Sequence, residues 1–198
     1  IELEIGEIYS AVVDSSNGYA YFGGVSQIAK VALTGGPVKP GVIGRAYLTP
    51  DDDISCAVID SINGYAYFGT DTEPGKVIKV DLGDGTEWPT KVGTLTLGSN
   101  EKNLKSAVID PDNGYAYFGT AGTGNRLVVK VALGSGSSLP TRVNGVLLNY
   151  NETDIQSAVI DTDNGYAYFG TLNEVVKIAL GAGSSAPTRI GAATLESG

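Results

Sequence analysis

Apolar residues of this chain are gathered in short runs separated by Gly, Asn, Asp and Pro. A run such as SAVVD, CAVID or SAVID is followed by a turn and then by YAYFG. Two further apolar runs follow, the first resembling IKVDL and the second resembling KVGTLTL. The sequence NGYAYFG itself occurs four times, at 17–23, 63–69, 113–119 and 164–170. The chain therefore contains four copies of one unit, and their Asn residues recur at intervals of 46, 50 and 51 residues.

Each unit is predicted to contain four β-strands. The runs are short, rich in β-branched and aromatic residues, and bounded by turn residues. No segment keeps a 3.6-residue apolar period for as long as a helix would need. The first two runs are expected to form a hairpin whose Asn-Gly lies in a type I′ turn, with positive φ at both residues. The Asp three residues before each Asn should accept turn N–H groups, and these residues are Asp14, Asp60, Asp110 and Asp161.

The faces of the YAYF strand indicate how the units pack. Its two tyrosines lie on one face and its Ala and Phe on the other, so both faces are apolar. Radially packed four-stranded blades cover both faces of each sheet, and a period near 50 residues suits such a blade. The sequence predicts an all-β β-propeller with four four-stranded blades per chain. Residues 1–198 would form one propeller domain or half-propeller, with repeats at about 10–55, 56–105, 106–156 and 157–198.

Two segments carry a resemblance to known propellers. VIDPDNGYAYFGT at 108–120 and VIDTDNGYAYFGT at 159–171 resemble β-propeller blades of the YVTN and WD40-like broad class. In that class an inner strand, a turn similar to SPDG and a second strand open each blade. The resemblance extends over nearly the whole chain, but the Trp-Asp dipeptide of true WD40 repeats is absent, so no subfamily is assigned. It implies the fold and leaves the function open, since propellers host binding modules, enzymes and scaffolds.

The first nine residues, IELEIGEIY, precede the first unit and resemble the end of a fourth strand, as in TLTLG at 94–98. As a closing strand, residues 1–9 would either complete the last blade of a four-bladed ring or help two chains pair head to tail in an eight-bladed ring. Cys56 is the single cysteine and cannot tie a ring within the chain. A two-chain ring leaves no unpaired strand edge, so we favour a homodimer. The absence of methionine suggests a processed product or a piece of a longer chain.

Charge and hydropathy exclude some partners. The chain has 22 acidic and 13 basic residues and a net charge of −9. This charge disfavours nucleic acid, which is bound through Lys and Arg. No window holds the roughly 18 apolar residues of a membrane helix, so no membrane insertion is expected. No segment has the pattern of a signal peptide. An extracellular or cell-surface location is favoured.

The residue types limit the chemistry. Histidine, the commonest general base and metal ligand, is absent, and one cysteine cannot form a zinc or redox pair. The segments at 110–114 and 161–165 resemble half of a calcium loop, but a strand follows where further ligands are needed. We therefore expect no catalytic residue, cofactor or metal. Four recurrent lysines should serve the sheet, with a recurrent acid as a candidate partner: Lys30, Lys79, Lys130 and Lys177.

Loops that differ among the units are the candidates for recognition. They lie between the second and third strands and between the fourth strand and the next unit. In a propeller these loops share one rim, where function commonly resides, although loops are also where duplicated repeats drift first. The candidate residues for a protein or carbohydrate ligand are Asp51, Asp52, Asp53, Asp71, Glu73, Asn125, Arg126, Asn151, Asp154 and Asn173.

The favoured function is a non-enzymatic scaffold or binding module, as part of a larger repetitive protein. One alternative is an enzyme of the lyase or glycosidase type that uses acidic rim loops. A glycosidase needs two carboxylates across one cleft, and the sequence does not show which acids would pair. Another alternative is an engineered or excised repeat fragment without its own activity. The lack of histidine and the near identity of the repeats favour the non-enzymatic interpretation.

Overall fold

The computed structural model describes residues 7–33, 39–49, 52–122 and 125–195. These residues form sixteen strands and no helix. The strands make four antiparallel sheets, each a meander of four consecutive strands. The first blade contains β1 (Ile8–Asp14), β2 (Tyr19–Gly24), β3 (Gln27–Ala32) and β4 (Gly41–Tyr47), and the second contains β5 (Ile54–Asp60), β6 (Tyr65–Thr70), β7 (Lys76–Asp81) and β8 (Thr90–Thr96). The third contains β9 (Leu104–Asp110), β10 (Tyr115–Thr120), β11 (Leu127–Ala132) and β12 (Thr141–Leu147), and the fourth contains β13 (Ser157–Asp161), β14 (Tyr166–Gly170), β15 (Glu174–Ala179) and β16 (Thr188–Thr194). The prediction of four four-stranded blades is confirmed.

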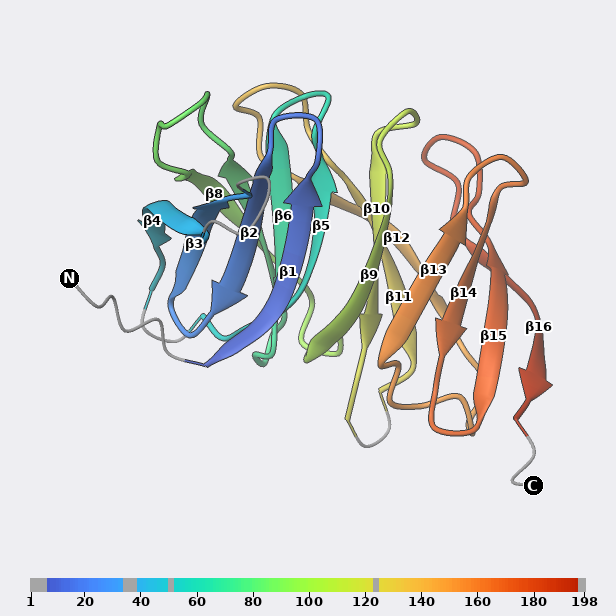
Figure 1. Cartoon of the computed structure of the whole chain (residues 1–198). Coiled ribbons are helices and arrows are strands. Elements are labelled where there is room, and N and C mark those ends of the chain that lie inside the picture. The colour runs from blue at the N-terminus through green and yellow to red at the C-terminus, as the bar shows by residue number, and fades with distance from the viewer. Residues whose placement is uncertain (1–6, 34–38, 50–51, 123–124, 196–198) are drawn as a thin grey trace.

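The blades lie side by side in an open arc (Figure 1). Their first strands adjoin, since β1 contacts β5, β5 contacts β9 and β9 contacts β13. The first and fourth blades lie at opposite ends of the arc, so this chain by itself is not a closed four-bladed ring. Of the expected closing strand at 1–9, residues 1–6 lie outside the described residues. Ile8 and Tyr9 belong to β1 of the first blade.

The Asn-Gly turns are not of type I′, so that prediction is wrong. Asp110 pairs with Tyr115, which leaves a four-residue loop rather than a two-residue one. Gly114 has a φ of 76°, but Asn113 is not among the residues with positive φ. The Gly114 N–H donates to the carbonyl of Pro111 at 3.1 Å, as in a type I turn closed by one left-handed residue. The predicted role of the aspartate is confirmed, since Asp110 accepts from the Asn113 N–H at 3.2 Å and from its side-chain amide at 2.8 Å.

Both faces of each inner blade are buried, as the YAYF pattern predicts. Each of the three apolar clusters joins two neighbouring blades. Phe68 is fully buried and Tyr67 is 1% exposed, although they point to opposite faces of β6. The glycine after Phe68 permits close approach, because a Cβ on Gly69 would lie 3.1 Å from the Cβ of Leu104 in the next blade.

A lysine from each of the first three blades is buried against the turn of the next blade. Lys79 is fully buried, and its Nζ donates to the carbonyls of Leu133, Gly134, Gly136 and Ser138 at 3.3, 2.7, 2.8 and 3.1 Å. The same Nζ lies 4.2 Å from the centroid of the Tyr65 ring. Lys30 and Lys130 make equivalent bonds. The partners are thus carbonyl oxygens and not the recurrent acid considered from sequence, because the ammonium donors meet turn carbonyls that need donors.

Candidate functional site

The variable loops share one rim of the arc, as predicted. The Asp71 N–H donates to the Asp53 carbonyl at 2.8 Å, which joins the β6–β7 loop to the segment leading into β5. The Asn103 N–H donates to the Thr72 carbonyl at 3.1 Å, which joins the same loop to the segment leading into β9. The Asn-Gly hairpins lie at the opposite rim (Figure 1). The β6–β7 loop is therefore bonded to the variable segments on both sides of it.

A groove of about 690 Å³ opens on this rim between the third and fourth blades. Its lining is contributed by the β10–β11 loop, the segment between β12 and β13, the β14–β15 loop with the first residue of β15, and β16. The lining residues are Gly122, Arg126, Tyr150, Asn151, Thr153, Asp154, Leu172, Asn173, Glu174 and Thr194. Four of the candidate residues from sequence, Arg126, Asn151, Asp154 and Asn173, are thus brought together.

Arg126 supplies the positive charge of the groove. Its guanidinium lies 5.6 Å from the centroid of the Tyr150 ring, so the aromatic face orients the cation. Its Nε is buried and has no hydrogen-bond partner among the described residues. Buried donors are nearly always paired in proteins, and a planar guanidinium suits carboxylate, phosphate or carbonyl oxygens. Because Arg126 lines the groove, the rest of its guanidinium can donate to an acceptor on a bound molecule.

Asp154 supplies a carboxylate that is oriented by hydrogen bonds. Its Oδ1 accepts from the Gly122 N–H at 3.1 Å and from Nε2 of Gln156 at 2.7 Å. Its Oδ2 has no donor among the described residues. Asp154 also has a φ of 60°, a left-handed conformation that Asp tolerates better than most residues. The side chain is therefore fixed through one oxygen while the other can accept a proton or a ligand hydroxyl.

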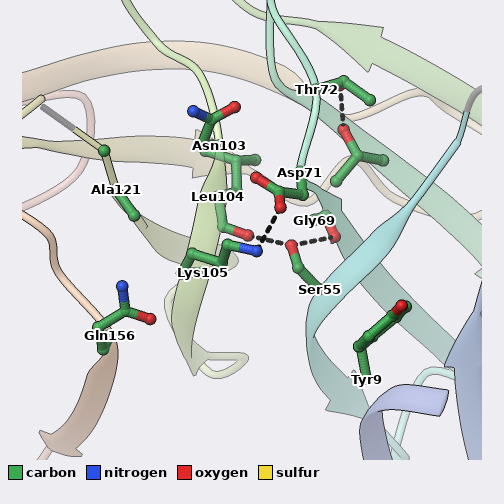
Figure 2. A network of polar contacts seen from close by, with 12 residues as sticks. Tyr9, Ser55, Gly69, Asp71, Thr72, Asn103, Leu104, Lys105, Ala121 and Gln156 are labelled. Atoms are coloured by element: carbon green, nitrogen blue, oxygen red, sulfur yellow. Dashed lines mark hydrogen bonds and ion pairs between the residues drawn. The ribbon is translucent and has the colours of Figure 1, made fainter. Parts of the chain in front are cut away.

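A second polar cluster lies on the same rim, between the second and third blades (Figure 2). Lys105 forms an ion pair with Asp71, and Nζ of Lys102 lies 2.9 Å from Oε1 of Glu73. The Lys102 hydrogen bond holds the pKa of Glu73 below its usual range. The hydroxyl of Ser55 donates to the carbonyl of Leu104 in the next blade. The candidates Asp71 and Glu73 thus lie outside the groove and are already paired.

Tyr9 and Gln156 lie to either side of this cluster (Figure 2). In each blade, one residue of the first strand pairs with the glycine of YAYFG. The residue directly before it is Tyr9 in the first blade, Ser55 in the second, Lys105 in the third and Gln156 in the fourth. The four units thus present different side chains at one structural position. This position is where a shared scaffold carries unit-specific chemistry.

Asp52 has a structural role. It is 1% exposed and accepts from Nζ of Lys76 at 2.7 Å and from the Thr49 N–H at 3.3 Å. Burial alone would raise the pKa of Asp52, but the Lys76 and Thr49 hydrogen bonds lower it overall. Two other buried acids, Glu101 and Glu152, have the same structural role and were not identified from the sequence. Each accepts from a backbone N–H three residues earlier and from an arginine side chain.

The remaining candidates also lie outside the groove. Asn125 is 9% exposed, and its side-chain amide donates to the Ala121 carbonyl at 2.7 Å, so it braces its own loop. Asp53 is exposed and pairs through its backbone with Val25. Asp51 lies outside the described residues. Sequence reasoning missed Tyr150 and Glu174, although Tyr150 lies in the variable NYNETD segment that could have indicated it.

No group of three or more His, Cys, Asp or Glu residues within the described ranges could hold a metal ion. In the part of the chain that the structure covers, no helix is long and apolar enough to cross a membrane. Among the described residues, the groove instead brings together the Arg126 guanidinium and the Asp154 carboxylate.

The arrangement of blades defines the chain as a β-propeller protein. No family model and no curated protein matches the sequence. Among solved structures, the fold is similar to a protein of Bacteroides uniformis named provisionally as a 6-phosphogluconolactonase, with a TM-score of 0.80 and 13% identity over 96% of this chain and 55% of that chain. It is similar to the periplasmic gluconolactonase PpgL of Pseudomonas aeruginosa, with a TM-score of 0.77 and 11% identity over 96% and 55%. A chain of a nidogen–laminin complex gives a TM-score of 0.62 and 14% identity over 92% and 64%.

These comparisons contradict the expectation of a non-enzymatic scaffold and favour its alternative, an enzyme. Several of the similar structures are named as lactonases. The absence of histidine does not exclude hydrolysis, because Asp, Glu and Arg can supply the base and the electrostatic stabilisation that hydrolysis needs. Identities of 11 to 14% establish the fold alone, and the chain spans about half the length of the lactonase structures.

Proposed function

We propose that the chain belongs to a hydrolase that opens the cyclic ester of a sugar acid, with its substrate in the groove between the third and fourth blades. The observation that carries this proposal is that one groove is lined by the Arg126 guanidinium, which forms no ion pair with any described residue, and by the Asp154 carboxylate, which is held through Oδ1. The lactonase names of several structures with this fold support the choice of reaction. A volume of about 690 Å³ falls within the range of small-molecule sites.

The proposed reaction uses each group for one task. A water molecule attacks the lactone carbonyl carbon while Oδ2 of Asp154 takes a proton from it. The carbonyl oxygen becomes an oxyanion, to which the Arg126 guanidinium donates a hydrogen bond. The bond between the carbonyl carbon and the ring oxygen then breaks, and the ring oxygen receives the proton held by Asp154. The product is an open-chain hydroxy acid.

Substrate recognition follows from the rest of the lining. Asn151 and Asn173 offer amide donors and acceptors that suit the hydroxyl groups of a sugar acid. Leu172 adds an apolar wall that suits the C–H face of a ring. The groove thus combines polar and apolar contacts of the kind that a carbohydrate-derived ligand presents.

The test is a pH-stat assay of acid release from glucono-1,5-lactone and from its 6-phosphate, with spontaneous hydrolysis subtracted. Asp154→Asn should lower the catalysed rate by about 10² to 10⁴-fold, since it removes the base and keeps the left-handed backbone. Arg126→Met should lower it by about 10² to 10³-fold. Asp112→Asn, an exposed change on the opposite rim, is the matched control. Hydrolysis no faster than the spontaneous rate, or an Asp154→Asn protein as active as the control, would refute the proposal.

A further inference from the structure

The two ends of the arc expose residues whose counterparts are buried elsewhere in the chain. At the first blade, Leu33 is 44% exposed, whereas its counterparts Leu82, Leu133 and Leu180 are 3 to 5% exposed. Ile8 is 49% exposed, whereas the residues in its place in the other blades, Ile54, Leu104 and Ile155, are fully buried. This end face lacks the blade that would cover it.

The fourth blade exposes the face that, in the other three blades, packs against the next blade. Val159 is 65% exposed, whereas Val58 and Val108 in the same position are each 6% exposed. Lys177, the fourth recurrent lysine, is only partly buried. Its Nζ lies 3.6 Å from the centroid of the Tyr166 ring and has no hydrogen-bond acceptor among the described residues. The aromatic half of the lysine site is therefore present and the carbonyl half is missing.

The internal contacts between blades show what this face is built to bind. Between the second and third blades, the Tyr67 hydroxyl and the Lys79 ammonium both donate to the carbonyl of Leu133, at 3.1 and 3.3 Å. The same pair of hydrogen bonds occurs at the other two internal contacts. The Leu82 carbonyl accepts from Tyr21 and Lys30, and the Leu180 carbonyl accepts from Tyr117 and Lys130. In the fourth blade the equivalent donors are Tyr168 and Lys177, and the leucine left without such donors is Leu33.

We propose that a second copy of this chain docks head to tail on these end faces, so that two chains form one closed ring. Tyr168 and Lys177 of one copy donate to the Leu33 carbonyl of the next, and Ile8 of the next copy packs against Gly170. The chain uses this interface three times between its own blades, so the two end faces are complementary halves of it. A partner of other chemistry would have to reproduce the leucine turn and the apolar first strand that a second copy already has.

The fourth blade also has the space that this docking requires. A Cβ on Gly23, Gly69 or Gly119 would meet a side chain of the next blade, namely that of Ile54, Leu104 or Ile155. A Cβ on Gly170 would meet only Ser157 of its own blade. The position against Gly170 that Ile8 would fill is therefore open.

The first test is the mass in solution, measured by light scattering over a range of protein concentrations. We expect twice the single-chain mass of 20.4 kDa. Lys177→Glu should raise the dimer dissociation constant at least tenfold, because it places a carboxylate against turn carbonyls. Lys102→Glu, which makes the same charge change on the exposed rim, should leave it unchanged. A mass of one chain at every concentration would overturn the proposal. So would a mass above two chains, or a dimer that Lys177→Glu does not weaken.

The second test identifies the contact itself and does not depend on the lysine. One preparation carries Ile8→Cys, and the other carries Gly170→Cys with Ser157→Ala, which removes the hydroxyl that a Cβ at 170 would meet. The matching internal positions, Gly69 and Leu104, would place their Cβ atoms 3.1 Å apart, so a shift of about 0.5 Å brings two cysteines there into the range of a disulfide. Mixing the two with diamide should give a covalent dimer, whereas replacing Ile8→Cys by Ile62→Cys, an 84% exposed site on the opposite rim, should not. Equal cross-linking in both mixtures, or none in either, would overturn the proposal.

Discussion

Replacing Lys79 by Met should destabilise the protein much more than the same change at Lys177. The two lysines occupy equivalent positions beside two tyrosines, and each lies 5.6 Å from the second of them. They differ in the hydrogen-bond acceptors around the ammonium group. Lys79 is fully buried and donates to four carbonyls of the next blade. Within one chain Lys177 has no next blade to contact. The pair therefore isolates the contribution of the lysine–turn contact.

The magnitude follows from the groups left behind. Met fills a volume similar to that of the lysine stem but donates nothing, so the turn carbonyls lose their shared donor. Each hydrogen bond to a charged group contributes about 1.5 to 3 kcal/mol, but these four share one ammonium whose burial is itself costly. We expect Lys79→Met to lower the free energy of unfolding by about 3 to 5 kcal/mol. Lys177→Met should change it by about 0.5 kcal/mol or less, because Lys177 is only partly buried and its removal leaves no described carbonyl without a donor.

Urea unfolding followed by circular dichroism measures both values. The comparison is made at a protein concentration where light scattering gives the mass of one chain, so that contacts between copies do not contribute. In a thermal scan the same loss corresponds to a fall in Tm of roughly 6 to 20 °C for a chain of this length. Equal losses for the two variants would refute the reasoning, because they would show that the carbonyl contacts add nothing.

Three further predictions concern a turn, an ion pair and the cysteine. Gly114→Val should lower the free energy of unfolding by about 1 to 3 kcal/mol, because Gly114 has a φ of 76°, and Gly114→Asn should cost less; an unchanged urea midpoint for the valine variant would contradict this. The hydrogen bond from Arg189 lowers the pKa of Glu152 below its ordinary 4.5. The unfolded chain therefore binds more protons at this residue than the folded chain does, so the ion pair stabilises the fold fully above pH 4.5 and loses its effect as the pH falls through the folded pKa. Glu152→Gln should therefore reduce the loss of stability between pH 6 and pH 3, and an unchanged pH dependence would show that the pair contributes nothing. Burial raises the pKa of the Cys56 thiol to about 12, so an aromatic disulfide reagent at pH 8 should label it only in urea; rapid labelling of the native protein would show that the second blade opens.

The strands and their packing could be predicted because the information is local and repeated. The alternation in YAYF assigns apolar side chains to both faces of one strand, and only a blade between two others buries both. The turn type was predicted wrongly because Asn-Gly is typical of two-residue hairpins as well as of the end of longer loops. The pairing of Asp110 with Tyr115 sets the loop at four residues, and the sequence does not show that pairing.

Contacts between blades could not be assigned from sequence. Arg142 of β12 binds Glu101, which lies 41 residues earlier in the segment between β8 and β9. Arg189 of β16 binds Glu152, which lies 37 residues earlier in the segment between β12 and β13. The carbonyl partners of Lys79 lie 54 to 59 residues further along the chain. Spacing within a repeat predicts which residues share a strand face. It does not specify which backbone groups of the next repeat face that strand.

The candidate site is found where the repeats differ, which is why four of its residues could be named from the sequence although their grouping could not. The carbonyl of Arg126 accepts from the Leu148 N–H, and the same bond is made by Ser26, Gly75 and Asn173 with Leu48, Leu97 and Leu195. Those four residues therefore occupy one position, and only the third blade places a cation there. What the four units share builds the blades, and what they do not share makes one groove chemically distinct from the others. A search for function in such a chain should therefore begin with positions that are structurally equivalent and chemically different.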